Sequence, residues 1–199
     1  MKSVLGRTSL FALVLFTLYI NAASAAIRTV AFTTPPGIIR NAQINGVGQV
    51  ALYGNFSGEE DGFWREGSGT GLELVAQIGT PAPGISGANF SFVSNSAFNN
   101  AGQMAFAGSL TGSQVTSSNN LGNWSDGGGA LAMLARQGDP AAGVGSSYDL
   151  FTALALNDAG EGAFFASLDR NSGDLVVKLP TARVDELIDQ RLHAADTGP

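Results

Sequence analysis

The sequence predicts an all-β protein in which antiparallel four-stranded repeat units form a partial β-propeller-like array with a C-terminal helix. Three observations support this prediction: a recurring turn-and-strand phrase, a nearly constant spacing between its copies, and an unusual composition. Of 199 residues, 27 are glycine, 13% are charged and 44% are apolar. That apolar content is too high for a disordered chain, and the glycine content is typical of short strands joined by tight turns.

The recurring phrase is a tight turn followed by a short alternating strand. Its copies run over 45–56, 99–110 and 157–168, and each begins with asparagine. The sequence separation between Trp64 and Trp124, and that between Pro81 and Pro140, is similar to the separation between successive copies of the phrase. A fixed period with several strand signals per unit is typical of a propeller or related array. We expect the asparagine to cap each turn, because its side chain bonds nearby backbone and tolerates a left-handed conformation.

One unit is predicted to contain four strands. The expected strands of the chain are 50–56, 62–66, 72–77, 89–93 (with an extension to 98 as the alternative), 103–110, 122–125, 130–136, 162–168 and 174–179. A shortened strand-and-turn segment is expected at 30–37. The strand at 103–110 carries apolar or small residues on both faces, so we expect it to lie inside the protein. A small residue stands in the middle of this strand and of its two counterparts, at Gly108, Gly54 and Ala166. This predicts a close approach of the backbone or a β-bulge.

The chain divides into three parts. Residues 1–25 resemble a signal peptide, with a basic start, an apolar run at 10–20 and the small-residue site Ala23-Ser24-Ala25. An uncleaved N-terminal anchor is the alternative. Residues 26–179 form the β-repeat domain, with units near 44–93, 94–151 and 152–179. Residues 180–199 are expected to form a helix and tail, with Val184, Leu187, Ile188 and Leu192 on one face.

The balance of basic and acidic residues limits the classes of binding partner that the sequence predicts. Removal of Lys2 and Arg7 with the signal peptide leaves eight basic residues against sixteen acidic ones. This balance argues against nucleic acid and anionic membrane surfaces, which attract basic patches. The mature chain has no predicted membrane span. The chain contains no cysteine, which excludes disulfides and cysteine-based zinc sites.

The sequence identifies no catalytic, cofactor-binding or metal-binding residue, and the ligand-binding residues are unknown. His193, the single histidine, is expected at a solvated helix end. Asp139 and the pair Asn157-Asp158 lack the spacing of a calcium loop, although calcium stays open. Trp64 and Trp124 are expected to pack between sheets, with a sugar-stacking platform as the alternative. The remaining candidates are expected to be turns or chance patterns: Glu59-Glu60-Asp61, the glycine runs 67–71 and 127–129, and the sequons at Asn55, Asn89 and Asn123.

The motif Asn157-x-x-Gly160-x-x-Ala163-Phe164-x-Ala166 resembles the repeat of bacterial choice-of-anchor tandem-repeat proteins. The copies beginning at Asn45 and Asn99 match it less fully, and the segment 135–143 is similar to the family's second turn. The resemblance covers most of residues 30–168. It implies exported, β-propeller-like proteins of largely unknown function, often tethered at the cell surface. The segment 179–182 lacks the spacing of a sortase signal.

These observations favour a non-enzymatic module, secreted or held in the periplasm or at the cell surface, that binds or scaffolds a glycan or protein. No cofactor is implied. The alternatives are a secreted carbohydrate-active enzyme using Asp or Glu and a fragment of a longer propeller. Because the end units leave apolar surface and strand edges, self-association is expected.

Overall fold

The computed structural model describes residues 29–31, 36–56, 58–67, 71–141, 143–169 and 174–179. These residues form an all-β structure, with no α-helix among them. The strands are β1 (Ile38–Ile44), β2 (Val50–Asn55), β3 (Gly62–Glu66), β4 (Leu72–Gln77), β5 (Ala88–Phe98), β6 (Met104–Gly112), β7 (Leu121–Ser125), β8 (Ala132–Arg136), β9 (Tyr148–Leu156), β10 (Gly162–Leu168) and β11 (Asp174–Leu179).

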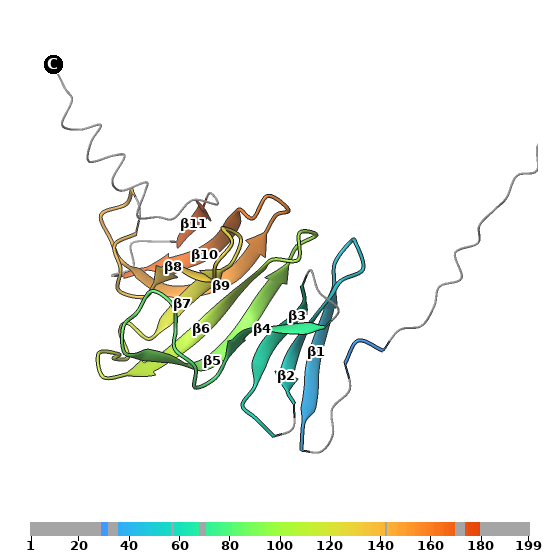
Figure 1. Ribbon diagram of the computed structural model, residues 1–199. Coiled ribbons are helices and arrows are strands. Elements are labelled where there is room, and N and C mark those ends of the chain that lie inside the picture. Colours follow the sequence, from blue (N-terminus) through green and yellow to red (C-terminus); the bar gives the residue numbers. More distant parts are fainter. Residues whose placement is uncertain are drawn as a thin grey trace, which may run out of the picture.

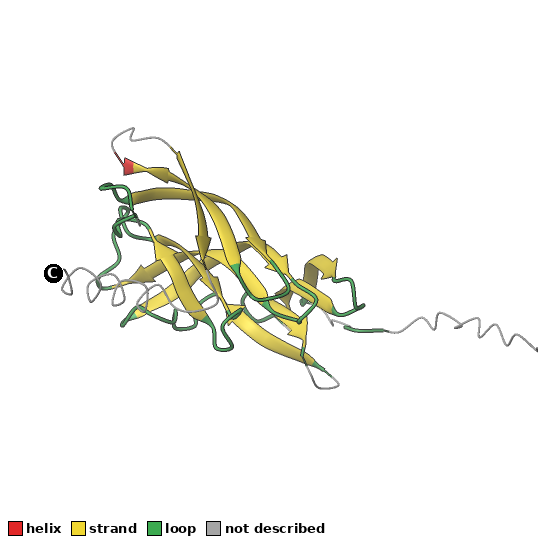
Figure 2. Ribbon diagram, turned by 90° about the horizontal axis from the view of Figure 1, so that it is seen from above, coloured by secondary structure: helices red, strands yellow, loops and turns green. Residues whose placement is uncertain are grey.

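The strands form three antiparallel sheets that follow one another along the chain (Figure 1). Sheet 1 has the order β1-β2-β3-β4, sheet 2 the order β5-β6-β7-β8, and sheet 3 the order β11-β10-β9. Within each sheet, neighbouring strands are joined by short connections, which only antiparallel pairing allows. The view from above shows that the described residues are almost entirely strands and the loops that join them (Figure 2). The described sheets form an open array, with no closed barrel or propeller among them.

Side chains pack the sheets together at two junctions. At the first junction, Phe63 of sheet 1 meets Phe106 of sheet 2, with ring centroids 5.4 Å apart. Phe90 and Trp124 extend this cluster within sheet 2. At the second junction, Ala135 of sheet 2 joins a cluster made by sheet 3, whose buried members include Tyr148, Phe151, Phe164, Ala166 and Leu168. Burial of these apolar surfaces supplies the main favourable free energy of stacking.

Most predicted strands are confirmed, several of them to the residue, as at Gly62–Glu66 and Asp174–Leu179. The strands β1 and β9 were missed, since no strand was predicted at 38–44 or 148–156. Ile38–Ile44 forms β1, whereas residues 29–31, where the earlier strand was expected to start, are not in a strand. Two prolines precede β1, and proline cannot donate to a ladder, so the strand begins after them. The observed sheets span 38–77, 88–136 and 148–179. The predicted units begin near 44, 94 and 152, which are positions at the end of β1, within β5 and within β9.

The interior position of β6 is confirmed, because Met104, Ala105 and Phe106 are all buried. The expected close approach is also confirmed at Gly108. A Cβ added there would lie 3.1 Å from Trp124 Cζ3 and 3.2 Å from a Phe90 ring carbon. In sheet 1, a register shift between Ile39 and Asn41 lies opposite this column.

The helix predicted at 181–194 lies outside the described residues, and nothing in the structure supports it. His193 falls outside them too, as do residues 1–25. Among the described residues, no helix has the length and apolar character needed to cross a membrane.

Candidate functional site

The asparagine that begins each repeated turn caps it, as predicted. Asn99 Oδ1 accepts hydrogen bonds from the backbone N–H groups of Ala101 at 3.1 Å and Gln103 at 2.8 Å. Its Nδ2 donates to Gln103 Oε1 at 2.7 Å. Asn45 and Asn157 make the same contacts in their own turns. These bonds satisfy backbone donors that the turn would otherwise leave without partners.

The same asparagines also join one turn to the next. Asn45 Nδ2 donates to the Asn99 carbonyl oxygen at 2.8 Å, and Asn99 Nδ2 donates to the Asn157 carbonyl oxygen at 2.7 Å. We call this chain of bonds the asparagine ladder. Each carbonyl also accepts an N–H from its own turn, at Gly102 or Gly160, which its two lone pairs allow. The ladder therefore links all three sheets at one edge.

The residue after each asparagine forms a second row of contacts. Asn100 Oδ1 accepts from the Gly46 N–H at 2.6 Å, while Asp158 accepts from the N–H and the Nδ2 of Asn100, both at 2.8 Å. These two hydrogen bonds hold the pKa of the Asp158 carboxyl below its usual value of 3.8. Both oxygens of Asp158 are thus engaged by a neighbouring turn, which makes Asp158 a structural residue in this arrangement.

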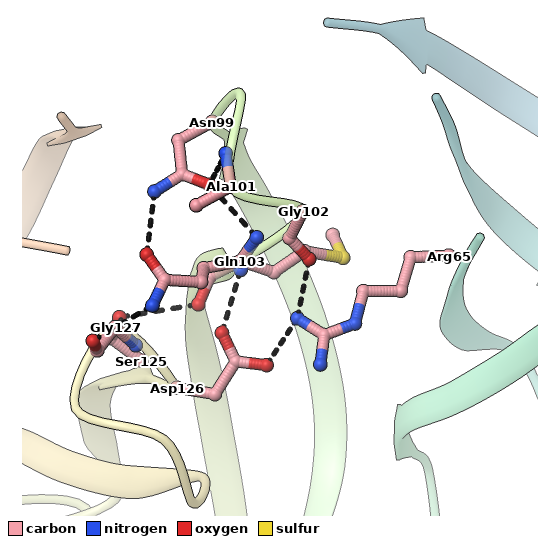
Figure 3. A network of polar contacts seen from close by, with 9 residues as sticks. Arg65, Asn99, Ala101, Gly102, Gln103, Ser125, Asp126 and Gly127 are labelled. Carbon is pink, nitrogen blue, oxygen red and sulfur yellow. Dashed lines mark hydrogen bonds and ion pairs between the residues drawn. The ribbon is translucent and has the colours of Figure 1, made fainter. Parts of the chain in front are cut away.

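A buried ion pair lies beside the ladder at the first junction (Figure 3). Arg65 of β3 pairs with Asp126 and donates to the Gly102 carbonyl oxygen at 2.7 Å. Asp126 also accepts from the Met104 N–H at 2.7 Å. Burial raises the pKa of the Asp126 carboxyl, while the bond from Met104 and the Arg65 charge oppose the rise. The ion pair connects β3 of sheet 1 to the residue that follows β7 of sheet 2, and the Arg65–Gly102 hydrogen bond connects β3 to the turn before β6.

The second junction uses different groups at the same positions. Asn123 of β7 takes the place that Phe63 has in β3, since each directly precedes the repeated tryptophan. Asn123 is 1% exposed, and neither its Oδ1 nor its Nδ2 has a partner among the described residues. Nearby, the backbones of Gly127 and Gly160 touch, so a Cβ on either glycine would overlap the other's carbonyl oxygen.

The two tryptophans differ, although they occupy equivalent register positions. Trp124 is fully buried, contacts Phe90 and Phe106, and donates from Nε1 to the Pro83 carbonyl oxygen at 3.0 Å. Its predicted packing role is confirmed. Trp64 is half-buried and meets the edge of Phe56. Its buried Nε1 has no partner among the described residues.

The other sequence candidates are dispersed. Asp139 lies away from the Asn157-Asp158 turn in the chain, and burial raises its pKa while Arg136 opposes the rise. Glu59 and Glu60 are exposed, whereas Asp61 bonds Arg40 at 2.8 Å. Asn123 is buried, so its sequon is not accessible in this fold. No group of three or more potential His, Cys, Asp or Glu metal ligands occurs within the described ranges.

A pocket of about 620 Å³ lies under the turn between β8 and β9. Asp169 is the one carboxylate in its described lining, which otherwise consists of Pro140, Ala141, Gly143, Val144, Gly145, Ser146 and Ser147. Sequence reasoning missed both this pocket and the ladder. A signal for the second row of contacts was present, because Asn100 and Asp158 both place an oxygen-bearing side chain directly after the repeated asparagine.

The fold and these contacts define an all-β protein of packed antiparallel sheets whose turns are joined by asparagine side chains. The chain belongs to the family of unknown function DUF7453, whose model matches residues 22–178. No curated protein and no solved structure is significantly similar to it.

Proposed function

We propose that the protein is an exported, non-enzymatic module that binds or scaffolds a glycan or protein at the cell surface or in the periplasm. The asparagine ladder is the observation that carries this proposal. The polar residues that recur in the chain, Asn45, Asn99 and Asn157, bond their own turns, and Asn45 and Asn99 also bond the next turn. Recurring polar groups committed to internal bonds suit a rigid support better than a reaction site.

The proposal includes a finer view of the fold. The three sheets are units of a tandem, propeller-like repeat, similar to those of bacterial choice-of-anchor proteins, and residues 1–25 direct export. The equivalence of Asn45, Asn99 and Asn157 in hydrogen bonding supports the tandem arrangement. The basic start and small-residue site at Ala23-Ser24-Ala25 support export.

The pocket beneath the β8–β9 turn is the proposed ligand site. Its described lining offers backbone groups, two serines and the single carboxylate Asp169, which suits hydrogen bonding to sugar hydroxyls. Most glycosidases need a pair of carboxylates, about 5 to 10 Å apart, flanking the bond they cleave. A lining with one carboxylate therefore favours binding over hydrolysis.

A glycan-binding array, read beside a panel of glycosidase and lyase substrates, tests the proposal. We expect binding without turnover, and loss of that binding when Ser146→Trp fills the pocket. Turnover that one Asp or Glu substitution abolishes would instead establish the enzyme alternative. Mass spectrometry of the native protein tests export, with Ala26 expected as the first residue.

A further inference from the structure

Asn45 and Gly46 form the one Asn-Gly pair in the sequence, and the pair lies in the turn between β1 and β2. In such a pair the backbone nitrogen of the glycine can attack the asparagine side chain, because glycine has no side chain to obstruct the approach. The asparagines of the other two repeated turns are followed by Asn100 and Asp158, whose side chains crowd the same nitrogen. The three equivalent turns therefore differ in one chemical respect, since only the first carries a readily attacked amide.

The reaction open to this pair is an intramolecular deamidation, which needs only water. The Gly46 nitrogen forms a bond to Asn45 Cγ, the bond from Cγ to Nδ2 breaks, and Nδ2 leaves as ammonia with the proton that the Gly46 nitrogen gives up. Water then opens the resulting succinimide ring at one of its two carbonyls. Opening at one carbonyl gives aspartate, and opening at the other gives isoaspartate, in which the backbone runs through the former side chain.

Hydrogen bonds from sheet 2 hold both reacting groups in the folded protein. The Gly46 N–H donates to Asn100 Oδ1 at 2.6 Å, so the attacking nitrogen keeps its proton in a hydrogen bond. Asn45 Nδ2, the leaving group, donates to the Asn99 carbonyl oxygen and to Gln49 Oε1, both at 2.8 Å. Gly46 is exposed and Asn45 is only half-buried, so water reaches the pair. Hydrogen bonding across the first junction, and not burial, therefore restrains the reaction.

The contact that restrains Gly46 also requires a glycine at that position. A Cβ on residue 46 would lie 2.8 Å from Asn100 Oδ1, so a larger residue would displace Asn100 from the N–H that it accepts. Gly46 is not among the glycines with positive φ, so close approach explains this glycine and backbone conformation does not. The stacking of the two turns thus selects the residue that makes Asn45 reactive.

Deamidation would break the asparagine ladder where it joins sheet 1 to sheet 2. The Asn45 amide donates two hydrogen bonds through Nδ2, whereas a carboxylate only accepts them. Its negative charge would also face the Asn99 carbonyl oxygen, and isoaspartate would lengthen the backbone of the turn. Because the nitrogen leaves as ammonia, the original bond to the next turn does not return when the sheets close again.

We propose that Asn45 is a deamidation site that the packing of sheet 1 on sheet 2 protects and that separation of the two sheets exposes. Opening of the first junction frees the Gly46 nitrogen and the Asn45 amide together. Groups protected in this way react in proportion to the population of the open state. The modification therefore accumulates with each opening of the first junction and weakens the junction that protected it.

Peptide mapping by mass spectrometry measures deamidation at Asn45 in the purified protein, kept in a mildly alkaline buffer. The reference is the same chain unfolded in urea, in which no sheet protects the pair. We expect the folded protein to react at least about 10-fold more slowly than the unfolded chain, with Asn99 and Asn157 slower than Asn45 in both. Equal rates in the folded and unfolded chains, or faster reaction at Asn99 or Asn157, would overturn the proposal.

Two variants distinguish opening of the first junction from global unfolding. Asn100→Ala removes the acceptor of the Gly46 N–H and should speed deamidation at Asn45 by about 5-fold or more. Gly160→Ala is the control, because it places a Cβ against the Gly127 carbonyl oxygen at the second junction and leaves the contacts of Asn45 in place. Circular dichroism confirms that both variants are folded during the assay. An Asn100→Ala rate no faster than that of the control would contradict protection by the first junction.

The effect of the modification on the fold is tested by Asn45→Asp, which carries one of the products in every molecule. Hydrogen exchange should become faster in the strands of sheet 1 than in the unmodified protein, because the bond to the Asn99 carbonyl oxygen is lost. Exchange in sheet 3 is the internal control and should be unchanged. Equal exchange of sheet 1 in the two proteins would show that the amide does not help to hold the junction.

Discussion

The first and second junctions each join two neighbouring sheets of the same kind, but different types of side chain lie at equivalent positions in the two junctions. At the first, Phe63 lies on Phe106 and Arg65 pairs with Asp126. At the second, Asn123 and Ser125 occupy the positions of Phe63 and Arg65, and two glycine backbones touch. The asparagine ladder runs through both junctions unchanged. The comparison shows that the turn contacts preserve the stacking of the sheets while the side chains between them vary.

The largest expected effect comes from removing the aromatic anchor of the first junction. Trp124→Ala should lower the free energy of unfolding by about 3–5 kcal/mol, because it leaves a cavity beside Phe90 and Phe106. Trp64→Ala, the equivalent change in sheet 1, should cost clearly less, since Trp64 is only half-buried. Denaturant unfolding measures both, and equal losses would contradict the assigned difference in burial.

Breaking the buried ion pair should rank next. Arg65→Ala leaves the Asp126 carboxylate buried without its partner, at a cost of about 3 kcal/mol. The matched control is Arg40→Ala, whose ion pair with Asp61 is largely solvent-exposed at the arginine and should contribute less than about 1 kcal/mol. Urea titration compares the two variants, and an Arg65→Ala loss no larger than the control's would refute a structural role for the pair.

The backbone contact of the second junction can be tested at one glycine. Gly127→Ala places a Cβ against the Gly160 carbonyl oxygen, which forces the sheets apart and should cost about 1–3 kcal/mol. Gly71→Ala provides the control, because its added Cβ meets no atom within 4 Å. Thermal unfolding should separate the variants, and matching midpoints would show that the sheets accommodate the methyl group.

Making the second junction more like the first should stabilise it. Asn123→Leu replaces a buried amide that has no partner among the described residues with an apolar group of similar shape. Such a replacement removes an unmet hydrogen-bonding requirement and should add about 1 kcal/mol to the free energy of unfolding. Asn123→Ala distinguishes this effect from simple loss of the amide, because it also leaves a cavity. A loss of stability in Asn123→Leu would indicate that the amide has a bonding role.

The smallest effect is a difference in pH response between the junctions. The pKa of Asp126 is raised above 3.8, so its contribution to stability falls as pH rises from 3.8 through the folded-state pKa. The pKa of Asp158 is lowered, so its contribution is present above 3.8 and is lost as pH falls through the folded-state pKa. Carboxyl NMR titration measures both values. Asn100→Ala should return the Asp158 pKa toward 3.8 and leave Asp126 unchanged.

The sequence by itself determined the strands and turns, because these depend on local chemistry. Equivalence with the tryptophan-bearing strand of the second unit placed Gly62–Glu66, and alternating side chains placed Gly162–Leu168. Asparagine before a glycine-containing turn predicted the caps at Asn45, Asn99 and Asn157. The recurrence of these phrases also predicted that the strands group into similar antiparallel sheets. The strand β1 was missed because Ile38–Ile44 carries polar residues at positions where alternation would place apolar ones.

Only the tertiary structure decided how the sheets meet. Trp64 and Trp124 read alike in sequence, but burial of Trp124 depends on sheet 1 lying against it and on a carbonyl at Pro83, 41 residues away. The pairing of Arg65 with Asp126 and the ladder from Asn45 to Asn157 likewise join residues that are distant in the chain. Such contacts depend on the relative placement of packed sheets, which no local pattern specifies because each sheet's neighbour is set by side-chain packing across the junction.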